Sequence, residues 1–225
     1  MFLKISDLAT AAGVDEKIVL NWIKQRGLPA HKQDDRYRVN RIDLLEWATT
    51  HDITLPPEIF SINDEHPDRP LVSEALLNGG IFYDLPGNTP ETALHEVVYR
   101  LKLPPSLDPE FLLQTLLARE ALGSTAFGNG IAIPHVRNPI LGQTSDSSIS
   151  LCFLKNPIDF NAIDGKPVTT LFTLVTPNVK VHLNLLAKLA FLLHDDGFLK
   201  LLHIPGAKSD IMLTIRRLEE TNVRR

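Results

Sequence analysis

A proline-rich, acidic stretch divides this sequence into two parts. Residues 51–70, HDITLPPEIFSINDEHPDRP, hold four prolines and five acidic residues among few periodically spaced apolar positions. Proline fixes φ and removes a backbone donor, so this composition neither continues a helix nor joins a sheet. The sequence therefore predicts a linker over 51–70, a small unit over 1–50 and a larger unit over 71–225 that is long enough for its own core.

The composition indicates a soluble chain in a reducing compartment. The 225 residues include a single cysteine, Cys152, so neither an internal disulfide nor a cysteine-based zinc site can form. The N-terminus lacks the apolar core of a signal peptide, and no apolar run approaches the ~20 residues that span a bilayer. We therefore expect a cytoplasmic protein without membrane insertion. The net charge of −4 argues against general coating of nucleic acid but leaves room for a local basic face.

Residues 1–50 show the pattern of a small winged helix-turn-helix. The stretch SDLATAAGVDEKIVLNWIKQRGLPA predicts two short helices that meet at a turn around Gly13. A polar turn between strand formers, HKQDDRYRV, and a third helix, RIDLLEWA, follow it. The second helix carries an apolar stripe on one side and polar residues on the other, and the polar residues Asn21, Lys24 and Gln25 could meet base edges.

This unit resembles the excisionase-type, MerR-like DNA-binding module over about its first fifty residues. The resemblance implies that the second helix enters the major groove and that the hairpin lies along the flanking backbone. The DNA-contacting residues it implies are Lys17, Asn21, Lys24, Arg36 and Arg38. The unit has eight basic and seven acidic residues, a weak positive balance for a DNA binder, so a module that binds a protein partner or has lost DNA binding is the alternative.

Residues 71–225 alternate apolar strands with amphipathic helices. The strand predictions are GIFYDL, IAIPH, SISLCFL and VTTLFTLVT. The helix predictions are NTPETALHEVVYRL, DPEFLLQTLLAREALG, NVKVHLNLLAKLAFLLH and SDIMLTIRRLEE. This alternation predicts an α/β fold in which helices cover both faces of a central sheet.

The stretch GNGIAIPHVRNP places His135 directly after a strand that ends at Pro134. Glycine lets backbone amides approach an anion, and a side chain at a strand end projects where α/β sites usually lie. A neutral imidazole at such a place is a competent nucleophile toward phosphorus. A structural histidine is the alternative that the local chemistry leaves open. No Walker GK[ST] follows, so nucleotide binding is not implied.

A longer signature favours the nucleophilic role of His135 over the structural one. The stretch REALGSTAFGNGIAIPH, together with PIDFNAIDGKPVTTLFTLVTP and HLNLLAKLA, resembles the enzyme IIA domain of the fructose/mannitol type in the bacterial phosphotransferase system. The resemblance covers about residues 71–220 and implies that His135 accepts a phosphoryl group from the phosphocarrier HPr. It also implies that Arg119 and His182 lie beside the phosphorylated ring.

Further residues of the signature are expected to support the site. Ser124, Thr125 and Asn129 are plausible minor donors to the phosphate, although Asn129 equally suits a turn. The family commonly has glycine where Ala126 stands and a very small residue where Val136 stands. We therefore expect less backbone freedom in the loop at Ala126 and added bulk beside the acceptor ring at Val136. We expect no cofactor and no metal, because no ligand set accompanies the two histidines.

The leading hypothesis is a phosphohistidine-bearing regulator of transcription that reads the state of the phosphotransferase system. It would act as a phosphoryl carrier rather than as a turnover enzyme, with HPr and DNA as its partners. The alternatives are a phosphocarrier that relays phosphate to a sugar transporter component, with the N-terminal module serving protein interaction, and a binding domain that is not phosphorylated. Analogy with DNA readers of this type also suggests a homodimer.

Overall fold

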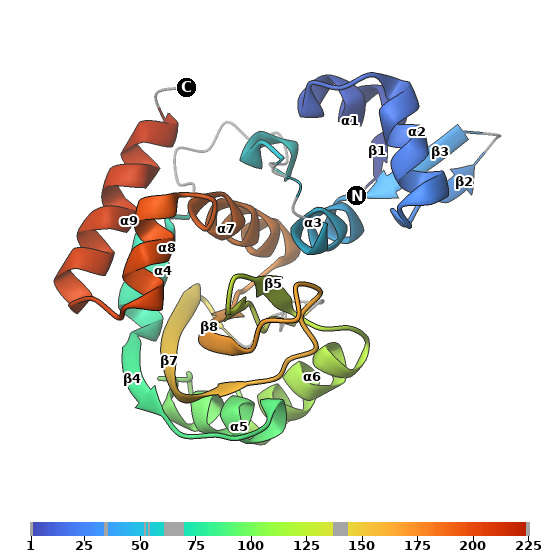
Figure 1. Cartoon of the computed structure of the whole chain (residues 1–225). Helices are drawn as coiled ribbons and strands as arrows, with labels where there is room; N and C mark the ends of the chain where they lie inside the picture. Colours follow the sequence, from blue (N-terminus) through green and yellow to red (C-terminus); the bar gives the residue numbers. More distant parts are fainter. Residues whose placement is uncertain are drawn as a thin grey trace.

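A computed structural model of the chain describes residues 2–33, 36–51, 53, 55–60, 70–136 and 144–223 (Figure 1). Residues 34 and 35 of the predicted hairpin turn and most of the acidic half of the predicted linker lie outside these ranges.

The N-terminal unit contains the predicted helices and hairpin, with one additional strand. Its elements are β1 (Phe2–Lys4), α1 (Ile5–Ala12), α2 (Glu16–Gln25), β2 (His31–Gln33), β3 (Arg36–Asn40) and α3 (Arg41–Thr50). The strands form an antiparallel sheet in the order β1-β3-β2. Asp15 and Asn40 cap α2 and α3 by accepting hydrogen bonds from the second backbone amide of each helix. The rings of Trp22 and Trp47 pack 5.3 Å apart in the core of the unit.

The start of the predicted linker does not behave as a linker. Leu55, Ile59 and Phe60 are buried, and residues Pro57–Phe60 form a short 3₁₀ helix, η1, that packs against α1 and α7. The Nε of Arg41 also donates a hydrogen bond to the carbonyl of Ile59 at 2.8 Å. The proline count suggested a solvated segment, but apolar side chains between the prolines gain more from burial than from exposure.

The larger unit is built on a mixed five-stranded sheet. Its strands are β4 (Ile81–Leu85), β5 (Ala126–Gly128), β6 (Ile131–Ala132), β7 (Ser148–Ile158) and β8 (Val168–Val175), in the order β4-β7-β8-β6-β5. The pairs β4–β7 and β6–β8 are parallel, whereas β7–β8 and β5–β6 are antiparallel. The two-residue β6 thus brings the end of the glycine-rich stretch alongside β8, in the interior of the sheet.

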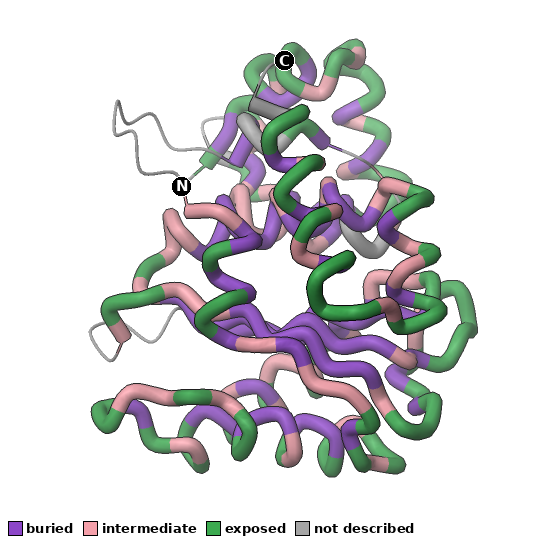
Figure 2. Tube along the Cα trace, turned by 90° about the vertical axis from the view of Figure 1, so that its left-hand side faces the viewer, coloured by how far each residue is buried: buried purple, intermediate pink, exposed green. Residues whose placement is uncertain are grey.

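Helices cover both faces of this sheet, as the sequence predicts. On one face lie α5 (Pro90–Arg100) and α6 (Pro109–Ala121); on the other lie α4 (Val72–Gly79), α7 (Val179–Leu192), α8 (Asp196–His203) and α9 (Lys208–Val223). Figure 2 shows the strands as a largely buried layer between the two sets of helices. Side chains alternate along β7: Leu151 joins the core under α4 and α7, and Cys152 joins the core under α5. Within the part of the chain that the structure describes, no helix is long and apolar enough to cross a membrane.

The N-terminal unit packs directly on the larger one. Helix α3 contacts α7 and β5, and η1 contacts α7. One continuous cluster of buried apolar residues runs through both units and includes Leu44 and Phe60 on one side and Leu185 on the other. In Figure 1, α3 lies between the five-stranded sheet and the rest of the N-terminal unit.

Candidate functional site

His135 follows the end of β6, at the point where the chain stops pairing regularly with β8. Pro134 accepts a backbone hydrogen bond from Leu174 at 3.1 Å, and His135 then forms an isolated parallel bridge with the same residue. Proline cannot donate to a ladder, so regular pairing stops here and the next side chain stands at the end of the sheet. The sequence placed His135 at a strand terminus, and the structure has it there.

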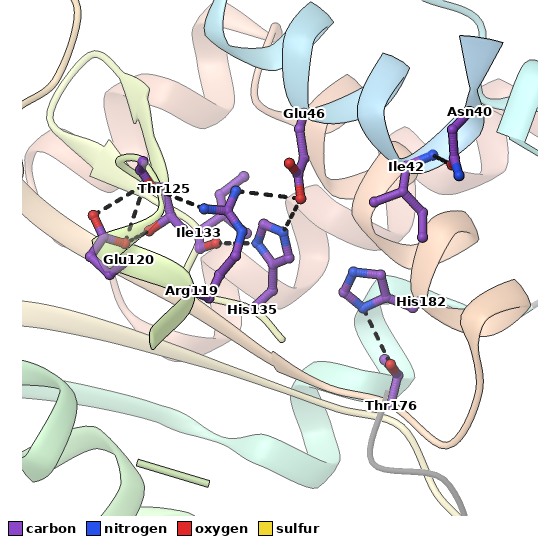
Figure 3. A network of polar contacts seen from close by, with 11 residues as sticks. Asn40, Ile42, Glu46, Arg119, Glu120, Thr125, Ile133, His135, Thr176 and His182 are labelled. Atoms are coloured by element: carbon purple, nitrogen blue, oxygen red, sulfur yellow. Dashed lines mark hydrogen bonds and ion pairs between the residues drawn. The ribbon is translucent and has the colours of Figure 1, made fainter. Parts of the chain in front are cut away.

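The hydrogen bonding of His135 defines which ring nitrogen can react. Its Nδ1 lies 2.7 Å from the carbonyl oxygen of Ile133. A carbonyl can only accept, so Nδ1 carries the hydrogen, and in the neutral ring the lone pair is on Nε2. Nε2 has no hydrogen-bond partner among the described residues, although it faces Oε1 of Glu46 at 3.5 Å. The nitrogen that could attack phosphorus is therefore oriented and not engaged by a hydrogen bond (Figure 3).

Arg119 approaches the same point from the last turn of α6. Its Nη1 donates to the carbonyl of Gly123 at 2.8 Å, which anchors the side chain across the end of its own helix. Its Nη2 lies 3.4 Å from Oε1 of Glu46, the oxygen that also faces His135. Only 10% of the side chain is exposed. One oxygen atom thus lies within ion-pair distance of both the guanidinium and the imidazole.

His182 completes the group from the second turn of α7. The rings of His135 and His182 are 5.3 Å apart between centroids, and Nδ1 of His182 lies 3.3 Å from the hydroxyl of Thr176. Burial lowers the pKa of His182 to about 3, with further lowering from His135 and Arg119 against an opposing effect of Glu46. His182 is therefore neutral at physiological pH.

The buried neutral state of His182 predicts a dependence of stability on acid. The unfolded chain binds a proton at this residue below about pH 6.5, whereas the folded chain resists protonation until about pH 3. Its contribution to stability is thus present above pH 6.5 and is lost as the pH falls through this window, by roughly a few kcal/mol in total. In urea titrations between pH 7 and pH 4, His182→Gln should lose less unfolding free energy than the parent. The variant of an exposed histidine, His203→Gln, should follow the parent, and equal slopes for all three proteins would contradict the assignment.

The three predicted minor donors have other partners. The hydroxyl of Thr125 donates to the carboxylate of Glu120, and that of Ser124 donates to the carbonyl of Phe160. Asn129 has φ of 52° in the turn between β5 and β6, and its side-chain oxygen accepts from Lys166. The hydrogen-bonding groups of these three side chains are used to hold the loop that they belong to. The geometry therefore does not support the expectation that they bind phosphate.

The two departures from the family pattern do not crowd the ring. Val136 is fully buried in the cluster under α5 and α6, because successive residues of an extended chain point to opposite sides. Ala126 is buried in β5 and does not require a left-handed backbone. The expectation of added bulk beside the acceptor ring was wrong for Val136, because the side chain belongs to the opposite face of the sheet.

Sequence reasoning missed Glu46, which lies above Arg119 and His135 in Figure 3. The sequence held no signal for it. Leu44, Leu45, Trp47 and Ala48, spaced at i, i+1, i+3 and i+4, fall on one broad apolar face of the helix and are all buried. Glu46 lies on the opposite side of the helix, where a charged residue is expected to face solvent.

The predicted DNA-contacting residues are accessible. Lys17, Asn21 and Lys24 are exposed and share one face of α2, at spacings of four and three residues. On β3, Arg36 is exposed and Arg38 is half-buried. In Figure 1, α2 and the hairpin lie beyond α3, on the side away from the five-stranded sheet.

Comparison with known proteins agrees with the fold and with the order of the two units along the chain. Residues 75–217 match the family model of the phosphoenolpyruvate-dependent sugar phosphotransferase system, EIIA 2, and residues 2–52 match a helix-turn-helix domain model. The class is thus an EIIA-type α/β domain with a helix-turn-helix in front of it. The chain belongs to the EIIA type 2 family, as the signature around His135 predicts.

Relatives with regulatory names are among the similar proteins. The nitrogen regulatory protein of Pseudomonas aeruginosa is 38% identical over 125 residues, which cover 54% of this chain and 79% of that protein. The nitrogen regulatory protein of Escherichia coli (strain K12) is 35% identical over 119 residues, 52% of this chain and 71% of that protein. The crystal structure of nitrogen regulatory protein IIA-Ntr from Neisseria meningitidis superposes with a TM-score of 0.56 at 28% identity, and covers 64% of this chain and 98% of that chain.

Proposed function

We propose that this chain is a cytoplasmic regulator whose His135 accepts a phosphoryl group from an HPr-type phosphocarrier. The observation that carries the proposal is the convergence of three groups on one point: the non-hydrogen-bonded Nε2 of His135, the anchored guanidinium of Arg119 and the neutral ring of His182. Family membership supports phosphoryl chemistry at this place. The names of the relatives support regulation over sugar transport.

The proposed transfer is an in-line displacement between two imidazoles. The Nε2 lone pair of His135 forms a bond to phosphorus while the nitrogen–phosphorus bond of the donor phosphohistidine breaks, and the electron pair leaves with the donor ring. The hydrogen on Nδ1 stays on its bond to Ile133, so the acceptor ring is held in place throughout. Arg119 stabilises the charge on the transferred oxygens.

His182 has a defined part in this scheme because it is neutral. In the tautomer whose Nδ1 accepts from Thr176, its Nε2 carries a hydrogen that no acceptor among the described residues takes up. That hydrogen can be donated to a phosphoryl oxygen. The three oxygens of the transferred phosphoryl group thus face one cation, the guanidinium of Arg119, and one neutral donor, the ring of His182, instead of two cations.

The second half of the proposal is that residues 2–52 bind DNA. A helix-turn-helix domain model covers these residues, and Lys17, Asn21 and Lys24 lie exposed together on α2. Phosphorylation adds up to about two negative charges at His135, so the phosphorylated and unphosphorylated chains differ in charge close to α3. The change in charge is the signal that the DNA-binding unit would read.

The test of the proposed function uses the full chain. It is incubated with phosphoenolpyruvate, enzyme I and HPr, and acid-labile phosphate on the chain is counted; we expect one phosphoryl group per chain. The same two forms are then applied to random duplex DNA at rising salt. We expect retention to fall steeply with salt, as it does when phosphates are neutralised, and to differ between the two forms. A chain that takes no label, or a salt response that is flat for both forms, would contradict the corresponding half.

A further inference from the structure

Glu46 of the N-terminal unit reaches into the site of the larger unit. It belongs to α3, yet its Oε1 lies 3.4 Å from Nη2 of Arg119 and 3.5 Å from Nε2 of His135. The side chain is 15% exposed, so the carboxylate makes these approaches largely away from water. Figure 3 shows it pointing down from α3 toward the arginine and the histidine.

The place that Glu46 occupies is the place of the transferred group. A phosphorus atom on Nε2 and its oxygens would extend from the ring over about the distance that separates Nε2 from Oε1. Both anions need the same partner, the guanidinium of Arg119, which pairs with carboxylate and phosphate alike. The carboxylate is therefore a stand-in for the phosphoryl group, supplied by the chain itself.

Helix α3 also covers the ring of His135, so that a phosphocarrier protein cannot reach it. His135 is 5% exposed and His182 is fully buried, so an incoming phosphohistidine cannot line up with Nε2 while α3 is in place. A cleft of about 350 Å³ opens beside the contact and is lined by residues that include Glu46, Arg119 and Gly123. Among the described residues His135 is not part of its lining, so this cleft exposes the arginine but not the nucleophile.

We propose that Glu46 makes α3 an internal competitor of phosphorylation: the helix docks on the unphosphorylated site, and a phosphoryl group on His135 expels it. The proposal rests on the proposed function and adds the device that couples its two halves. A phosphoryl group and the Glu46 carboxylate are both anions and compete for one guanidinium, so the two cannot share the site. Because coupling between two events is reciprocal, whatever holds α3 in place slows phosphorylation, and whatever phosphorylates His135 frees α3.

The test compares the rates at which phospho-HPr labels the parent chain and Glu46→Gln. The glutamine keeps the shape of the side chain and removes the charge that pairs with Arg119, so α3 should leave the site more often and labelling should be at least about tenfold faster. Glu46→Asp, which keeps the charge on a shorter side chain, should restore slow labelling in part. Glu16→Gln removes the same charge from the first turn of α2, on an exposed residue, and should label like the parent.

A second measurement follows the docking directly. In small-angle X-ray scattering, the parent should show a larger radius of gyration after phosphorylation, and Glu46→Gln should show the larger radius already before it. Circular dichroism of each variant shows whether the N-terminal helices are retained. Faster labelling can then be distinguished from the effect of an unfolded N-terminal unit.

The outcomes separate this inference from the proposed function. If the parent and Glu46→Gln label at the same rate, or if the radius is unchanged by phosphorylation, the competition is disproved while His135 remains the acceptor. If neither protein takes label, the proposed function fails and this inference fails with it. A parent that labels barely and a Glu46→Gln variant that labels fast would support both.

Discussion

Replacing His135 with glutamine is expected to reduce the phosphoryl label on the chain to background. Glutamine places an amide where the ring was, and an amide nitrogen has no free lone pair to attack phosphorus. The other ring in the site is a poor substitute, because His182 is fully buried on α7. The loss should be complete within the sensitivity of the assay rather than partial, since the acceptor atom itself is removed.

A matched variant keeps this experiment specific. His95→Gln removes an exposed histidine of α5, whose side chain is 54% exposed, and should label as the parent does. Thermal unfolding of both variants shows whether loss of label follows from loss of fold. Label that survives in His135→Gln would move the acceptor to another residue, and His182→Gln would be the next variant to label.

Replacing Gly79 with alanine is expected to destabilise the larger unit by about 3 kcal/mol or more. Gly79 ends α4, where the helix lies against the backbone of β7. A Cβ at this position would stand 2.2 Å from the carbonyl oxygen of Ile149 and 2.8 Å from the nitrogen of Ser150. Neither atom can yield, because both belong to the interior of the sheet, so the helix would have to move off the strand.

The control for Gly79→Ala is an alanine that meets a side chain which can move. At Gly206 the nearest atom to an added Cβ is a terminal methyl of Leu201, at 3.3 Å, and no unusual φ is required. Gly206→Ala should therefore shift the thermal midpoint little, whereas Gly79→Ala should lower it by roughly 6–12 °C. Equal midpoints for the two variants would show that α4 tolerates displacement from β7.

The fold of the larger unit was predictable where the signals are local. Thr89 and Asp108 cap the N-termini of helices α5 and α6, each is followed by a proline in the first turn, and both starts are visible in the sequence. Helix α4 was missed because its start is not local. Leu71 offers no side-chain cap, and the amide of Val72 instead donates to the carboxylate of Glu219, 147 residues away on α9.

The site also has residues that the sequence could identify and one that it could not. From local chemistry alone His135 could have been structural, and only the long signature singled it out together with Arg119 and His182, which the structure brings together. Glu46 has no local signal, because its partners belong to a different unit. Its apolar neighbours fall on one face of α3 and Glu46 on the other, so the periodicity predicts a solvated carboxylate where the structure has one packed against the larger unit.

The hydrogen bond between Nδ1 of His135 and Ile133 has a consequence for regiochemistry. Imidazole can be phosphorylated on either nitrogen, which gives two isomers of phosphohistidine with different lifetimes. With Nδ1 tied to the main chain, the proposed phosphorylation of His135 should give a single isomer, the one substituted on Nε2. Transfer in and transfer out would then use the same ring atom in the same orientation, and the imidazole would not need to flip between the two.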